Sequence, residues 1–205
     1  MIELYDRYSQ ESRDLHESLA ATGLSQLGVV IDADGFLPDG LVSPFTYYLG
    51  YEKGKPLYFN QVPVPAFWEI SGNNQSARIE DVTEERAVIH YADGMQARLV
   101  KQVDWKDLEG RVRQVDHYNR FGACFATTTY SADSEAIMTV YQDVNGQEVL
   151  LENHVTGDIL LTLPGQSMRY FANKVEFITF FTPVMLPTIV PTFNQYALET
   201  MLCSK

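Results

Sequence analysis

The sequence predicts a mainly β protein, with a minor α component, built on a long antiparallel meander. Aromatic residues make up 12% of the 205 residues, with twelve Tyr and eleven Phe, and these side chains favour strands. From residue 77 onward, strand-like runs alternate with turn sequences every ~8–16 residues, as in a meander. Runs such as RVRQVDHYN carry charges on both faces. Mixed faces favour a single-layer extended sheet, whereas the alternative, a closed sandwich or barrel, needs one apolar face on each strand.

The chain opens with a predicted helix over residues 7–23. Ser9 can cap its N-terminus, and Gly23 is a natural C-terminal stop. The run GVVID at 28–32 predicts a short strand that ends at an Asp-Gly turn. The apolar stripe of the predicted helix consists of Tyr8, Leu15 and Leu19.

Prolines and glycines interrupt the sequence repeatedly over residues 34–76. The run Val62-Pro63-Val64-Pro65 lacks two of the amides that a central strand needs, which predicts an edge strand or an extended loop. Residues 1–76 are therefore expected to hold the N-terminal helix, a short strand and a covering segment rich in proline and aromatic residues.

Residues 77–172 form the predicted antiparallel meander. Its turns include Asp93-Gly94 and Asn145-Gly146, residue pairs that supply the positive φ of tight hairpins. The strand-like runs are, in order, ARIEDV, ERAVIHY, MQARLVKQVDW, RVRQVDHYN, ACFATTTY, AIMTVYQ, QEVLLENH, ILLTL and SMRYFA.

Residues 173–205 are predicted to form a short C-terminal helix and an apolar tail. Asn173 and Glu176 have the spacing of a capping box before VEFITFF, and Pro183 is expected to stop this helix. The tail TIVPTFNQYALETMLCSK is expected to pack on something, and the start of a further domain is one explanation.

Composition excludes several classes of partner. The net charge of −12 repels phosphate polyanions, so neither nucleic acid nor a bare anionic membrane is an expected partner. The most apolar stretch, 175–191, contains Glu176 and three prolines and is a poor bilayer span. No secretory signal is visible at the N-terminus, and Cys124 and Cys203 form no CxxC pattern. These features indicate a cytosolic chain with free thiols.

No recognisable catalytic or metal-binding pattern occurs in the sequence. The D-x-D triplet Asp32-Ala33-Asp34 has the spacing of metal-dependent sugar-nucleotide transferases, but it also has the sequence of a tight turn, and no further ligands are evident. His117 follows Asp116, yet neighbouring strand residues point to opposite faces. The sequence therefore favours a β-rich binding or scaffold module, without cofactor or metal, over an enzyme.

Four segments resemble one family, the accessory Sec system glycosylation chaperone. The likeness runs from residue 1 to about residue 180, and its most distinctive part is the run of prolines, aromatics and amides at 56–77. The segments are FLPDGLVSPFTYYLG (36–50), PLYFNQVPVPAFWEISGNNQSA (56–77), LVKQVDWKDLEGRVRQVDHYNRFGACFATTTY (99–130) and VLLENHVTGDILL (149–161).

The resemblance implies a non-catalytic subunit that stabilises the O-linked N-acetylglucosamine transferase of serine-rich repeat adhesins. Members of this family continue into Rossmann-like lobes of a glycosyltransferase-B architecture, so residues 173–205 are expected to begin such a region. The implied partners are the catalytic transferase and the Ser/Thr-rich adhesin polypeptide, in the cytoplasm and at the membrane periphery through the complex. The family supplies no catalytic residues.

The expected binding surface is the distinctive segment itself. Aromatic side chains can pack against small side chains and sugars, and amides can hydrogen-bond a peptide backbone. The alternative is that the aromatics are core and that the amides form a turn. Alternative functions are a free-standing carbohydrate-binding β-module and a D-x-D sugar-nucleotide enzyme. The candidate residues are Tyr58, Phe59, Phe67, Trp68, Asn73, Asn74 and Gln75.

Overall fold

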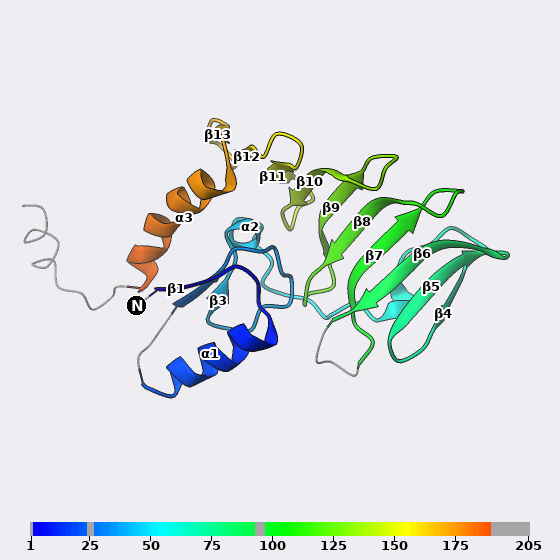
Figure 1. The fold of residues 1–205 in the computed structure, drawn as a ribbon, viewed down its shortest axis with the longest axis horizontal. Helices are drawn as coiled ribbons and strands as arrows, with labels where there is room; N and C mark the ends of the chain where they lie inside the picture. The colour runs from blue at the N-terminus through cyan, green and yellow to red at the C-terminus, as the bar shows by residue number, and fades with distance from the viewer. Residues whose placement is uncertain (1, 24–26, 93–96, 190–205) are drawn as a thin grey trace, which may run out of the picture.

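A single ten-stranded antiparallel sheet dominates the computed structural model, which describes residues 2–23, 27–92 and 97–189 (Figure 1). The strands follow one another in the sheet in sequence order, from β4 at one edge to β13 at the other. This arrangement confirms the predicted single-layer meander with an N-terminal and a C-terminal helix. Its strands are β4 (Glu69–Gly72), β5 (Ser76–Asp81), β6 (Glu84–Tyr91), β7 (Val100–Lys106), β8 (Val112–Tyr118), β9 (Cys124–Tyr130), β10 (Ala136–Gln142), β11 (Glu148–Asn153), β12 (Ile159–Leu161) and β13 (Arg169–Phe171).

The N-terminal part forms a small parallel sheet that sequence reasoning missed. It consists of β1 (Ile2–Tyr5), β2 (Leu27–Val30) and β3 (Leu41–Val42), of which only the middle strand was expected. Because β1 and β2 are parallel, a crossover must join them, and helix α1 (Gln10–Ala20) supplies it. The short helices α2 (Pro44–Tyr47) and η1 (Phe59–Gln61) follow in the covering segment.

Helix α1 has the predicted cap but not the predicted packing. The Ser9 side chain accepts a hydrogen bond from the Ser12 N–H, as an N-cap should, and Gly23 has a φ of +75° just beyond the helix. No residue of the helix is buried among the described residues, and Leu15 of the expected stripe is 51% exposed. Of the expected stripe, Tyr8, which precedes the helix, packs on a small cluster that includes Tyr5 and Val30, and the helix itself contributes no buried residue.

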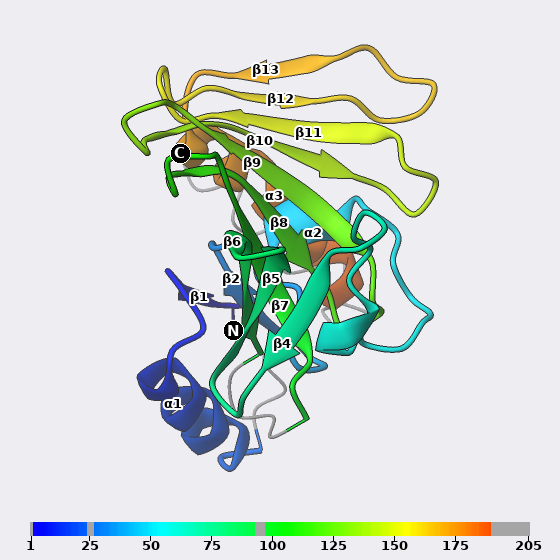
Figure 2. The ribbon, with the colours of Figure 1, turned by 90° about the vertical axis from the view of Figure 1, so that its right-hand side faces the viewer.

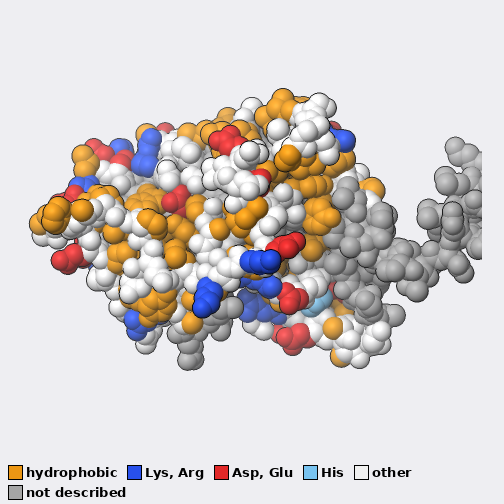
Figure 3. Space-filling model, turned by 180° about the vertical axis from the view of Figure 1, so that it is seen from behind, with side chains coloured by type: hydrophobic (Ala, Val, Ile, Leu, Met, Phe, Trp, Pro, Cys, Tyr) orange, Lys and Arg blue, Asp and Glu red, His pale blue; other side chains and the backbone are white. Residues whose placement is uncertain are grey.

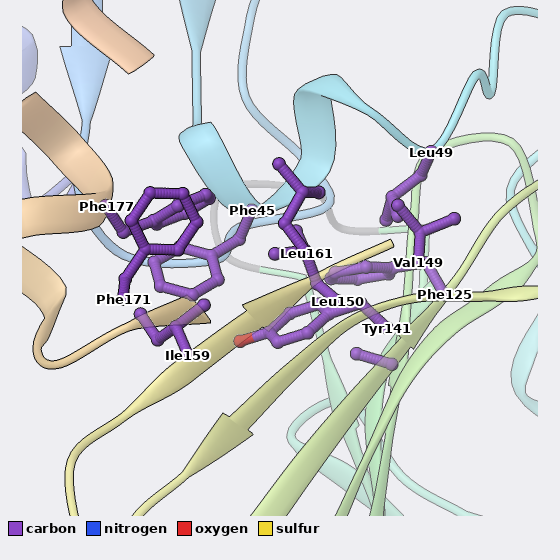
Figure 4. Close-up of a cluster of buried hydrophobic side chains, with 11 residues drawn as sticks. Phe45, Leu49, Phe125, Tyr141, Val149, Leu150, Ile159, Leu161, Phe171 and Phe177 are labelled. Atoms are coloured by element: carbon purple, nitrogen blue, oxygen red, sulfur yellow. The ribbon is translucent and has the colours of Figure 1, made fainter. Parts of the chain in front are cut away.

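The long sheet is one layer, and different segments cover its two halves (Figure 2). Beside strands β4–β8, Val62 and its neighbours pack on a cluster that includes Ile79, Ile89 and Val103. Over strands β9–β13, side chains of α2 and the C-terminal helix α3 (Lys174–Ile189) complete a second cluster (Figure 4). Its members are Phe45, Leu49, Phe125, Ala126, Tyr141, Val149, Leu150, Ile159, Leu161, Phe171 and Phe177.

Pro183 does not stop the C-terminal helix, contrary to the sequence prediction. The helix continues to Ile189, although Pro183 cannot donate to the Thr179 carbonyl four residues earlier. Phe177 and Phe181 of this helix are fully buried, and their packing offsets the lost hydrogen bond. The predicted cap is present: Asn173 Oδ1 accepts from the Glu176 N–H at 3.0 Å. The tail over 190–205 lies outside the described residues.

None of the helices in the described part of the chain is long and apolar enough to cross a membrane.

Candidate functional site

The candidate residues lie in two groups at opposite ends of strand β4. Tyr58 and Phe59 lie at the end where the β4–β5 hairpin turns, together with the amides of 73–75. Phe67 and Trp68 precede Glu69, which pairs with Glu80 at the other end of the hairpin. The structure therefore does not bring all the candidates into one surface.

The first group is an aromatic cluster held against the hairpin. Tyr58 forms a β-bridge with Leu99 and remains 37% exposed, and its ring centroid lies 4.9 Å from that of Phe59. The guanidinium of Arg98 lies 5.8 Å from the centroid of the Phe59 ring. Gly72 permits this approach, because a Cβ there would come within 3.0 Å of the Phe59 ring. Phe59 is therefore largely a packing residue, and Tyr58 presents the exposed face.

The three amides have different surroundings. Asn73 Oδ1 accepts from the backbone N–H groups of Gln75 at 2.7 Å and Ser76 at 3.1 Å, so this side chain closes the hairpin turn. Asn74 Oδ1 accepts from Arg98 at 2.7 Å. The Gln75 side chain is exposed. Among these amides, Gln75 is the one whose side chain is most available to a ligand.

Phe67 and Trp68 point in different directions despite being neighbours. Trp68 is half-buried against the cluster around Ile79, and the guanidinium of Arg86 lies 5.9 Å from its ring centroid. Phe67 is 98% exposed, with a backbone φ of +73°. The Trp68 ring therefore belongs to the edge of the core, and the Phe67 ring is free to meet a partner.

A polar site that sequence reasoning missed lies on the face of the sheet that also buries Tyr141. His117 Nε2 lies 3.0 Å from Thr128 Oγ1, which lies 2.8 Å from Thr139 Oγ1, which in turn lies 2.7 Å from His154 Nε2. This polar ladder crosses strands β8, β9 and β10 and ends just beyond β11. The sequence carried no usable signal, because the contacts depend on the register between strands.

The polar ladder lines a cavity of about 230 Å³ together with residues from outside the sheet. Tyr141 donates to Glu152 at 3.1 Å, and Lys174 of α3 forms an ion pair with the same carboxylate at 2.9 Å. Burial raises the pKa of Tyr141 well above its ordinary value, so the phenol stays a donor. Asp32 also lines the cavity. Such a mixture of hydroxyl, imidazole and carboxylate groups suits a neutral, hydroxylated ligand.

The D-x-D triplet has the geometry of a turn. Asp34 Oδ1 accepts from the Phe36 N–H at 2.8 Å, and Asp34 Oδ2 lies 3.2 Å from Lys101 Nζ. In the described ranges, no three His, Cys, Asp or Glu side chains converge in a way that could hold a metal ion. His117 and Asp116 have separate partners, as predicted, since Asp116 accepts from the Trp105 indole at 2.7 Å.

Cys124 is a half-buried thiol, and burial raises its pKa to about 11, so it is unreactive at neutral pH. The second cysteine, Cys203, lies outside the described residues.

Comparisons with protein-family models identify two matching segments. The family model described as the GtfB middle domain matches residues 68–172, about half of the chain. The model described as the GtfB N-terminal domain matches residues 2–48.

Curated relatives carry one common name, UDP-N-acetylglucosamine–peptide N-acetylglucosaminyltransferase stabilizing protein GtfB. The protein from Streptococcus pneumoniae serotype 4 is 93% identical over 181 residues, which are 88% of this chain and 41% of the relative. The Streptococcus gordonii protein is 55% identical over 183 residues, with the same two coverages, 88% and 41%. This chain thus spans about 41% of the length of these relatives.

Solved structures share the fold. A chain in a crystal structure of the GtfA/B complex bound to UDP and GlcNAc superposes with a TM-score of 0.86 at 53% identity, covering 90% of this chain and 42% of that one. A chain of the Gap123 complex from Streptococcus agalactiae, described as a glycosylation-associated protein complex, gives a TM-score of 0.71 at 12% identity, covering 91% and 44%. At that identity the second likeness shows a common fold alone.

Proposed function

The chain belongs to the GtfB family, and on that premise we propose that it is part of a non-catalytic subunit that stabilises and assembles with a peptide O-GlcNAc transferase. The names of the relatives support this proposal, since they are transferase-stabilizing proteins. The observation that carries it is the match to a chain of the GtfA/B complex, which covers nine-tenths of this chain. We further propose that the assembly works in the cytoplasm and meets the membrane only through the complex.

The open sheet offers a physical route to assembly. Its outermost strands, β4 and β13, have no strand on their outer sides among the described residues. Edge strands of this kind present backbone N–H and C=O groups that can pair with another strand. Tyr170 on β13 is 64% exposed and can supply contact area beside such a pairing. We propose that one edge meets the sheet of the transferase and that the other edge accepts an extended Ser/Thr-rich adhesin segment by strand addition.

A binding assay tests the assembly. The chain is immobilised, purified catalytic transferase is applied, and the melting temperature of the transferase is measured with and without the chain. We expect retention of the transferase and a rise in its melting temperature, because a partner that binds only the folded state stabilises it. Neither retention nor stabilisation would contradict the proposed function.

Acceptor binding is tested with Tyr58→Ala. The exposed Tyr58 ring and the Gln75 amide are the best-placed candidates for contact with an extended peptide. We expect weaker binding of an unglycosylated Ser/Thr-rich adhesin peptide with an unchanged fold, because Tyr58 is outside the core clusters. Unchanged peptide affinity would remove the aromatic cluster from the acceptor surface. Trp68→Ala is a less specific test, since the half-buried Trp68 also supports the fold.

A second candidate function, carbohydrate recognition, is favoured by the polar cavity. Hydroxyl, imidazole and carboxylate groups converge there in a volume of about 230 Å³, less than the roughly 300–1,000 Å³ of drug-sized ligand pockets. One sugar ring is of suitable size and chemistry. Titration with free N-acetylglucosamine, followed by the NMR signals of His117 and His154, tests this candidate. Perturbation that is lost in Thr139→Val supports it, and unperturbed signals exclude it.

A further inference from the structure

Two large apolar side chains lie in solvent at the same end of strands β4, β5 and β6. Phe67 is 98% exposed and Val82 is 90% exposed. Both residues have positive φ angles, +73° and +60°, in the left-handed region that glycine favours. Hydrophobic and acidic side chains protrude together at this end of the molecule (Figure 3). Phe67, Val82 and the carboxylates of Glu69, Glu80 and Glu84 are called the hairpin tip below.

The turn that contains Phe67 places a phenylalanine where the backbone conformation favours glycine. The Trp68 N–H donates to the Pro65 carbonyl at 3.3 Å, so residues 65–68 form a β-turn. Phe67 is its third residue, and a positive φ there defines a type II-like turn. Glycine or asparagine is preferred at that position because a Cβ is disfavoured. A fully exposed phenylalanine gains no packing in return.

The turn that holds Val82 repeats the pattern. Asp81 and Glu84 pair across a two-residue hairpin loop, and Val82 is the first loop residue. A positive φ at this place alone is typical of a type II′ turn, which prefers glycine first. A β-branched residue with positive φ is a conformational outlier. In both turns, the chain carries backbone strain in order to hold an apolar side chain outward, and nothing within the described residues offsets this cost.

Acidic side chains surround the two apolar residues. Glu69, Glu80 and Glu85 are partners in one cross-strand row, and like charges directly opposite each other are destabilising. Glu85 is neutralised by Arg78 and Lys106. Within the part of the chain that the structure describes, Glu69, Glu80 and Glu84 form no ion pair.

We propose that the hairpin tip is a docking surface for the catalytic transferase, with Phe67 and Val82 entering an apolar pocket that Lys or Arg side chains flank. Burial of the two side chains would supply the packing that the free chain lacks, and the cations would relieve the row of carboxylates. A second copy of this chain is an unsuitable occupant, because its own tip is acidic. A flexible Ser/Thr-rich acceptor has no fixed apolar pocket. The inference rests on the proposed function and locates one of its surfaces.

The test uses Phe67→Gly and Val82→Gly, measured for both stability and binding. Glycine relieves the strain, so each variant is expected to melt about 2 °C or more above the unchanged chain. The same variants are expected to bind the purified transferase about 10-fold more weakly, since buried aromatic anchors dominate interfaces. A gain in stability together with a loss of affinity would indicate that the strained turns serve binding of the transferase.

Matched variants separate the hairpin tip from general effects of exposure and charge. Val155 is 74% exposed on the β11–β12 turn, and Val155→Ala is expected to leave transferase binding unchanged. The double change Glu80→Gln and Glu84→Gln is expected to weaken binding and to reduce its dependence on salt. Fewer charge pairs with the transferase would then remain for salt to screen. The double change Asp133→Asn and Glu135→Gln, on the β9–β10 turn, is the charge control.

Two results would overturn the inference. The first is binding of Phe67→Gly to the transferase with unchanged affinity. The second is a lower melting temperature in both glycine variants, which would assign Phe67 and Val82 to folding. Failure of the unchanged chain to bind the transferase would instead contradict the proposed function, so the two failures are distinguishable.

Discussion

At the scale of single residues, the polar ladder has the best-defined geometry on the face of the sheet that buries Tyr141. Thr128 and Thr139 are 5% and 4% exposed, and each hydroxyl lies between two hydrogen-bonding partners. Three contacts among four groups need three protons, and the two hydroxyls supply two of them. One imidazole Nε2 must therefore carry the third when both histidines are neutral. The two hydroxyls thus link the tautomers of the histidines: when His117 Nε2 carries the proton, His154 Nε2 accepts, and the reverse also holds.

Loss of one hydroxyl from the polar ladder should destabilise the fold. Thr139→Val keeps the shape of the side chain but removes one of the two partners of Thr128 and the hydroxyl partner of His154 Nε2. We therefore expect a loss of about 1–3 kcal/mol in the free energy of unfolding. Urea denaturation measures it. Thr129→Val, an exposed position on the outer face of β9, is the matched control and should change stability little. Equal effects of the two changes would contradict a structural role for the ladder.

The ladder also predicts a pH dependence. Burial lowers the pKa of His117 from its ordinary value of 6.5. The unfolded chain therefore binds more protons than the folded chain below that value, so stability is lost as pH falls from about 6.5 through the folded pKa. We expect His117→Gln to flatten this loss, as measured by urea denaturation between about pH 5 and pH 8. An unchanged pH profile would show that His117 does not titrate with unfolding.

At the scale of elements, the sequence predicted the meander well and the parallel sheet poorly. Turn residues such as Asn145 and Gly146 determine hairpins locally, so the strands from β5 onward could be located without a structure. Strand β1 has four residues, and its pairing with β2 depends on a crossover that no local pattern reveals. The same limit applies to the polar ladder, whose partners lie 11 to 15 residues apart and meet only through register.

Helix α3 shows how packing overrides a local signal. The spacing of Asn173 and Glu176 correctly predicted its start, while Pro183 wrongly predicted its end. Burial of Phe177 and Phe181 could not be weighed against the proline from sequence, since their contacts with Phe45 of α2 and Val29 of β2 are distant along the chain.

Replacement of that proline should stabilise the helix. Pro183→Ala restores an N–H that can donate to the Thr179 carbonyl and removes the ring, so we expect a gain of about 1–3 kcal/mol in the free energy of unfolding. Urea denaturation checks it, with Val175→Ala at an exposed position of the first turn as the control. A loss of stability in Pro183→Ala would mean that the fold requires the proline conformation at this point.

At the scale of the whole molecule, the sheet separates two kinds of surface. One face packs on the N-terminal part and α3, and carries the polar cavity. The end formed by the β4–β6 hairpins extends away from both and carries the hairpin tip (Figure 1). Helix α1 contacts the small parallel sheet through His16, which lies 3.2 Å from Glu3 and edge-on to the Tyr5 ring, both on β1. We propose that β1–β3 and the region from residue 173 belong to the Rossmann-like lobe that the family resemblance implies.

The central claim is that this chain assembles with the catalytic transferase and stabilises it. Calorimetric titration of purified transferase with the purified chain, paired with thermal melting of the mixture, tests the claim most directly. We predict saturable binding at a fixed ratio and a melting temperature of the transferase that rises with the concentration of the chain. Absence of binding heat at two temperatures, together with an unchanged melting temperature, would contradict the claim.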